Sequence, residues 1–211
     1  KKDRIRIFLE EALKNADIYV NGDKSNIASK DPVSRINEAL GKLVAVQYSK
    51  LTYMEPAPEL SDIAAIFNTT GGQMSFIGTS DSIPNKLALD DVIGQISLNN
   101  QRRTKTSMKS LQDKFTSAPY GFDVKDVQWL VAMLFKLGRI SLSINSQELS
   151  LLSNTKDDLV RYITKRDFVE KMLVDIRERA TDGQIRSIKT VLKDYFGYTA
   201  TSDDDDVLQK S

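Results

Sequence analysis

Residues Pro119 to Leu152 read PYGFDVKDVQWLVAMLFKLGRISLSINSQELSLL, and the rest of the chain is organised around them. The first three of these residues are a turn signal, and Asp123 then stands where the N-cap of a helix would be. Apolar residues recur at helical spacing as far as Leu137 and lie on most sides of the helix, which predicts a buried helix. Gly138 predicts its end, because glycine readily takes the left-handed conformation that follows a helix. We expect three side chains of this helix to be mostly buried: Trp129, Leu130 and Leu134.

After Gly138 the apolar period changes from that of a helix to that of a half-buried strand. Ile140, Leu142 and Ile144 alternate with Arg139, Ser141 and Ser143. Asn145-Ser146 is a candidate two-residue turn, because Asn tolerates positive φ, and Leu149 and Leu151 are expected on the return strand. A helix followed by a hairpin is the order of recognition helix and wing in winged-helix domains. It predicts either DNA contact or a packing unit with a hairpin edge, and the apolar character of the helix favours packing.

The composition excludes several kinds of chemistry. The 211 residues include 30 Lys and Arg and 29 Asp and Glu, for a net charge of +1, and neither His nor Cys. The charge balance gives no global attraction to nucleic acid or membrane. The chain therefore has no disulfides, no thiolate or imidazole metal site, and no His base or Cys nucleophile. We expect no cofactor, no metal and no catalytic residue. The absence of Cys fits a reducing cytoplasm, and no apolar run approaches the length of a membrane span.

Residues 1–84 are predicted to be a helical N-terminal segment with a small hairpin. Ile5, Phe8 and Leu13 lie on one face of an amphipathic helix, and Asn21-Gly22 marks a turn after a short strand, with Ile27 expected on the return strand. Asp31-Pro32 opens the clearest helix, because Pro fits the first helical position. Its expected buried stripe consists of Val33, Ile36, Leu40, Leu43, Val44 and Leu51.

The loop-rich stretch from Asn68 to Pro84 is the predicted domain boundary. Its Gly71-Gly72 pair invites comparison with a phosphate-binding loop, but that loop needs G-x-x-x-x-G-K-[ST]. The interval from Gly72 to Gly78 has neither this spacing nor the Lys. A linker is therefore predicted here.

Residues 85–198 are predicted to be a winged-helix-like domain. Helices over 87–100 and 107–115 precede the buried helix, which gives the three helices that a winged helix requires. The window from Arg102 to Lys114 holds five basic residues and one acidic residue, a net charge of +4. It predicts either a phosphate-contacting patch or a solvated helix face. The candidate DNA contacts are Arg102, Arg103, Lys105, Lys109, Lys114 and Arg139.

The C-terminal third is predicted to hold two further helices and one ambiguous segment. Thr155 and Asp158 are a variant capping box that opens a short helix. Residues 168–179 fit both helical and strand spacing, and a strand is favoured because a new helix begins near Thr181. Residues 199–211 contain four consecutive aspartates, Asp203 to Asp206, and are predicted to be a flexible acidic tail. The fold class is therefore mainly α with small β-hairpins (α+β), a helical domain with a winged-helix-like segment.

Four runs of residues carry a resemblance to a known family: Ala16–Gly22, Asp31–Leu40, Pro119–Phe122 and Leu134–Ile140. They resemble the middle region of BrxC-type (PglY-like) proteins, the large P-loop proteins of BREX phage-defence systems. The resemblance implies a bacterial cytoplasmic parent of which this chain, which begins without Met inside a helical pattern, is an internal fragment. It also implies an ATPase module elsewhere in the parent. The implied partners are other BREX proteins or other parts of the parent chain.

Three functions follow as hypotheses. The first is a non-catalytic structural and interaction segment of a BREX ATPase, with protein–protein and candidate DNA contacts. The alternative is a winged-helix DNA-binding regulatory domain, against which the apolar third helix argues. An enzyme is the third, and no pair of carboxylates supports it.

Overall fold

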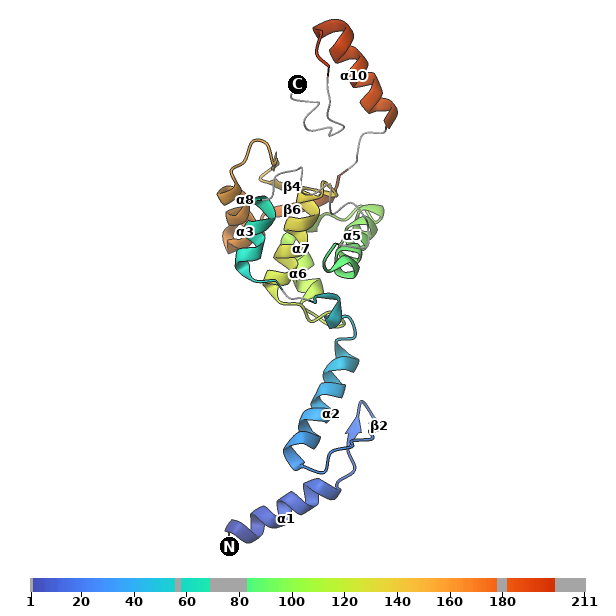
Figure 1. Ribbon diagram of the computed structural model, residues 1–211, viewed down its shortest axis with the longest axis vertical. Coiled ribbons are helices and arrows are strands. Elements are labelled where there is room, and N and C mark those ends of the chain that lie inside the picture. The colour runs from blue at the N-terminus through green and yellow to red at the C-terminus, as the bar shows by residue number, and fades with distance from the viewer. Residues whose placement is uncertain (1, 56–57, 69–82, 178–181, 200–211) are drawn as a thin grey trace.

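The computed structural model describes residues 2–55, 58–68, 83–177 and 182–199 (Figure 1). It has a compact body, with an arm at the N-terminal end made of α1 (Lys2–Asn15), a small hairpin and α2 (Pro32–Gln47). The last helix, α10 (Asp182–Phe196), lies at the opposite end of the molecule. The acidic run predicted at 203–206 and the Gly71-Gly72 loop lie outside the described residues.

The helices begin where their capping side chains predict. Asp31 accepts from the amide of Ser34 at 2.8 Å at the start of α2, and this contact lowers the pKa of the Asp31 carboxyl. Ser107 and Ser110 form a reciprocal capping box, each hydroxyl accepting at 3.0 Å from the other residue's amide, at the start of α6 (Met108–Phe115). Thr155 accepts at 3.1 Å from the amide of Asp158 at the start of α8 (Lys156–Thr164).

The body is built around α7 (Val124–Lys136), the predicted buried helix. The amide of Asp123 donates to Asp126 at 2.8 Å at its start, and Gly138 follows its end at φ 63°. Trp129, Leu130 and Leu134 are 6%, 0% and 1% exposed, which confirms the predicted burial. Helices α3 (Leu60–Asn68), α5 (Lys86–Gln101), α6 and α8 pack around it. Thus α3, which precedes the predicted boundary at residue 84, packs on helices that follow it.

A four-stranded antiparallel sheet covers one side of the body in the order β3-β6-β4-β5. Its strands are β3 (Thr106–Ser107), β4 (Ile140–Ile144), β5 (Gln147–Glu148) and β6 (Met172–Ile176). The inner face carries the alternating apolar residues of β4 and β6, which are buried except for the half-buried Ile176 at the end of β6. The predicted two-residue turn lies at Asn145-Ser146, where both residues have positive φ, 52° and 66°.

The hairpin after α7 differs from the prediction in its return strand. Strand β5 holds only Gln147 and Glu148. The amide of Leu149 still donates to the carbonyl of Leu142 in β4 at 2.8 Å, so Leu149 continues the pairing as predicted, and Leu151 lies beyond it. The long partner of β4 is β6, which pairs with it from Ile140↔Ile176 to Ile144↔Met172. The chain between them contains β5, α8 and the short α9 (Arg166–Val169). The ambiguous segment is therefore a strand over 172–176, while Phe168 belongs to α9.

Two further predictions, both about the arm, are wrong. The return strand of its hairpin, β1 (Tyr19–Val20) with β2 (Asp23–Lys24), follows Asn21-Gly22 at once and does not include Ile27. The predicted stripe of α2 is exposed, and Leu51 belongs to the 3₁₀ turn η1 (Leu51–Tyr53). The physical reason is that helical spacing sets which side chains share a face, whereas burial requires another element against that face. Neither α1 nor α2 has a buried residue.

Candidate nucleic-acid interface

The helix in the recognition position, α7, is enclosed. In helix-turn-helix proteins the recognition helix lies in the major groove of DNA. Nine of the ten residues of α7 from Asp126 to Phe135 are buried. Helices α3 and α8 cover α7 on one side and α5 covers it on the other (Figure 1). Gln128 is turned inward as well and donates to the carbonyl of Thr164 at 3.4 Å. The sides of α7 that carry these residues are therefore occupied by other elements of the body.

The six candidate DNA contacts are all exposed, but they stand on different elements. Arg102, Arg103 and Lys105 follow α5, Lys109 and Lys114 lie on α6, and Arg139 precedes β4. Lys109 forms an ion pair with Asp113 at 2.7 Å, which reduces the charge that it offers to a phosphate. The basic window is therefore a solvent-facing surface, as both of its predicted interpretations require.

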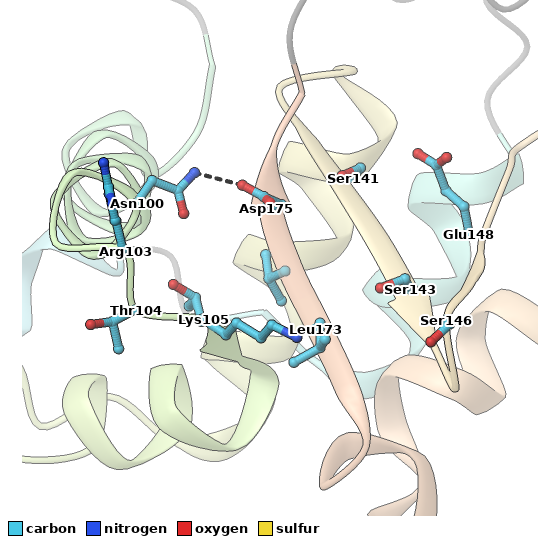
Figure 2. Close-up of a pocket in the computed structure, with 12 residues that line it drawn as sticks. Asn100, Arg103, Thr104, Lys105, Ser141, Ser143, Ser146, Glu148, Leu173 and Asp175 are labelled. Carbon is cyan, nitrogen blue, oxygen red and sulfur yellow. Dashed lines mark hydrogen bonds between the residues drawn. The ribbon is translucent and has the colours of Figure 1, made fainter.

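Two of these residues line a groove on the outer face of the sheet (Figure 2). The groove has a volume of about 480 Å³. Arg103 and Lys105 lie along one side, and the hydroxyls of Ser141 and Ser143 come from β4. Asp175 of β6 accepts from the side chain of Asn100 at 2.5 Å. The remaining lining residues are Thr104, Thr106, Ser146, Glu148, Leu173 and Val174.

The groove is balanced in charge, because Arg103 and Lys105 share it with Glu148 and Asp175. A phosphate backbone is attracted by clustered positive charge, and two carboxylates in the same groove offset the two cations. Sequence reasoning placed Ser141 and Ser143 on the outer face of the strand but did not single out Glu148 or Asp175. The alternation of polar and apolar residues predicts which side chains of a strand lie on the outer face of the sheet. It does not predict which strands are its neighbours, so Glu148 and Asp175 could not be assigned to the groove.

A second cluster, the junction, joins the arm to the body. It consists of Tyr48, Lys50, Asp91, Tyr120 and Gly121. The Lys50 ammonium group lies 2.5 Å from Asp91 Oδ2 and 5.0 Å from the centre of the Tyr120 ring. Its hydrogen bond to Asp91 raises the pKa of Lys50 above its ordinary value, and burial raises the pKa of Tyr120.

The backbone completes the junction. The amide of Lys50 donates to the carbonyl of Pro119 at 3.0 Å. Gly121 has φ +67°, and its α-carbon faces the ring of Tyr48, the C-cap residue of α2. A glycine is required here twice over, by the backbone conformation and by the close approach of the ring. The sequence identified Gly121 as a turn residue but gave no sign of this contact.

The described part of the chain shows no group of His, Cys, Asp and Glu side chains that could hold a metal ion. Within the same residues, no helix has the length and apolarity needed to cross a membrane.

Two family models match this chain. The model for the BREX ATP-binding protein BrxC winged helix-turn-helix domain matches residues 45–178, which is more than half of the chain and spans the whole body. The model for the BREX ATP-binding protein BrxC 4th domain with six-stranded beta sheet matches residues 1–43, which is most of the arm. No solved structure matches the chain. Both matches confirm the predicted resemblance, and the chain belongs to the BrxC family of BREX ATP-binding proteins.

Proposed function

We propose that this chain is a non-catalytic interaction and coupling segment of a BREX ATPase in the bacterial cytoplasm. The observation that carries the proposal is the different burial of apolar side chains in the body and in the helices at the two ends of the chain. The apolar surface of α7 is used inside the body, while α1, α2 and α10 present apolar side chains to solvent. Large exposed apolar surfaces of this kind mark protein contacts. They include Ile5, Phe8, Val33, Leu40, Leu43, Val191, Tyr195 and Phe196.

Coupling rests on the junction. Contacts that fix the end of α2 to the body transmit a force on the arm to the helices around α7. The Lys50–Asp91 pair is only partly buried, so it contributes at most about 1 kcal/mol, and the cation–π contact with Tyr120 adds about 0.5–1 kcal/mol. Tyr48 packs closely on Gly121, since a Cβ built at Gly121 would lie 2.5 Å from Cδ1 of the ring. The partners that fit such a segment are other BREX proteins or other parts of the parent chain.

The proposal is tested with the immobilised chain in biolayer interferometry. The analytes are the parent protein lacking this segment and each of the other BREX proteins. We expect saturable binding to at least one of them, weakened at least tenfold by Leu40→Glu/Leu43→Glu or by Tyr195→Glu/Phe196→Glu. Leu152→Glu is the matched control, because Leu152 is an exposed leucine of the body, 53% accessible. Absence of binding to every analyte would refute the proposal.

DNA contact is the second candidate function, and the exposed basic window favours it. Four phosphate contacts, from Arg102, Arg103, Lys105 and Lys109, would give a slope of log K against log salt of about −4. The binding would be tolerant of sequence, since phosphate contacts position a protein without specifying bases. Fluorescence anisotropy with a short duplex at several salt concentrations tests it. If Arg102→Glu/Arg103→Glu binds as well as the wild type with the same slope, the patch is a solvated surface.

A further inference from the structure

The arm holds less sheet than its family match describes. Residues 1–43 match a domain with a six-stranded sheet. Over residues 2–43, which the structure describes, there is one two-stranded sheet, with two residues in each strand. A hairpin of this size is not independently stable in water. A hairpin of two such short strands therefore requires further strands or packing against another element to be stable.

A groove beside the hairpin is open and mostly apolar. It has a volume of about 290 Å³ and lies between the end of α1, strand β1 and one face of α2. On α2 it is lined by Ile36, Leu40 and Leu43, which are 44%, 53% and 45% exposed. On the hairpin side it is lined by Ile18 and Val20. These are side chains of the kind that pack between a helix and a sheet in a two-layer domain.

The partly buried side chain of Arg35 connects the segments that line this groove. The guanidinium of Arg35 donates to the carbonyls of Leu13 at 3.1 Å, Ser29 at 3.2 Å and Ala16 at 2.5 Å. These bonds join α2 to the end of α1 and to both chain segments that flank the hairpin. The groove is thus formed before any partner binds, and the polar end of Arg35 is already occupied by backbone.

We propose that this groove, with the apolar face of α2, is covered by a β-sheet that continues from the β1–β2 hairpin. Its further strands come from another segment of the parent protein. Those strands would pair with an edge of the hairpin through backbone hydrogen bonds. Every second side chain would then point at α2, so the occupant is a strand with alternating apolar residues. This inference rests on the proposed function and names the partner of one of its surfaces.

The same observations weigh against a second copy of this chain as the occupant. Two copies could pair their α2 faces, but such pairing would leave both hairpins with unpaired edges, which proteins cover or protect. A sheet continued from the hairpin satisfies the edge and the apolar face together. The one charged residue in the groove is Arg35, and its guanidinium already donates to three backbone carbonyls, which weighs against phosphate or an acidic peptide as the occupant.

Amide hydrogen exchange tests the inference. The full-length parent protein is compared with the 211-residue chain, and protection is measured over α1, β1 and α2. Most helical stability in proteins comes from the packing of an apolar face, and α2 has no buried residue. We therefore expect exchange over α2 to be at least about tenfold slower in the parent, with the amides of α7 unchanged as the internal control. In the parent, Leu40→Glu/Leu43→Glu should abolish this protection, whereas Leu152→Glu should leave it intact.

Two results would overturn the inference. Equal exchange over α2 in the two proteins would mean that no segment of the parent covers it. Protection in the 211-residue chain alone that rises with its concentration would make a second copy the occupant. The proposed function is tested separately from this inference. If binding is lost in Tyr195→Glu/Phe196→Glu while α2 is unprotected in the parent, the proposed function stands through α10, and only the inference about the sheet is overturned.

Discussion

Gly121→Ala tests whether the arm is seated on the body as the structure shows. A Cβ at this position would lie 2.5 Å from Cδ1 of Tyr48 and 3.0 Å from both Cγ and Cε1. These atoms belong to the near side of the ring, so the whole ring has to move. Gly121 also has φ +67°, a conformation that costs a residue with a Cβ about 1–2 kcal/mol. Displacing a packed ring costs a further 1–3 kcal/mol or so, about that of overpacking a core. The expected loss is therefore about 2–5 kcal/mol.

The assay is urea unfolding followed by fluorescence of Trp129, the single tryptophan of the chain, which is buried in α7. The midpoint concentration of urea should fall with an unchanged slope, because stability changes and the surface exposed on unfolding does not. The same substitution in a Tyr48→Ala background should cost only the conformational part, about 1–2 kcal/mol.

The outcome that refutes this reasoning is an equal cost of Gly121→Ala in both backgrounds. It would show that the ring of Tyr48 does not rest on Gly121 in solution. Gly197→Ala is the matched control, because Gly197 has nearly the same φ, +66°, and no atom within 4 Å of the added carbon. It follows α10, so unfolding reported by Trp129 should not change.

Three further predictions concern the core, the pH dependence of stability and nucleotide. Leu134→Ala should cost about 2–5 kcal/mol in a thermal melt, because Leu134 is fully enclosed, and a loss under about 1 kcal/mol would contradict the assigned helix face. Burial raises the pKa of Asp126, so its contribution to stability is present at low pH and is lost as the pH rises through the folded-state pKa. Asp126→Asn, which cannot ionise, should therefore gain stability relative to the wild type as the pH rises from about 4 to about 7, and a constant difference in urea midpoint would contradict this. Titration calorimetry with Mg-ATP should give no binding heat, because the chain lacks the Lys and hydroxyl spacing of a phosphate loop, and micromolar affinity would disprove it.

The local features of this protein could be predicted from its amino-acid sequence. The central helix begins after Asp123 and ends before Gly138, and Asn145-Ser146 form the turn after the first long strand. Each of these features depends on hydrogen bonds or backbone angles within a few residues, which the chain specifies locally. The family resemblance was also readable, because it is carried by short runs of residues.

Which surfaces contact one another could not be predicted from the sequence and is known only from the folded chain. Strand β4 pairs with β6, about thirty residues away, rather than mainly with the adjacent β5, and this pairing brings Asp175 into the groove beside Arg103. The apolar spacing of α7 and α2 is similar in kind, yet α7 is enclosed and α2 is exposed. Periodicity fixes which side chains share a face, but burial depends on a partner element that is distant in the chain or outside it.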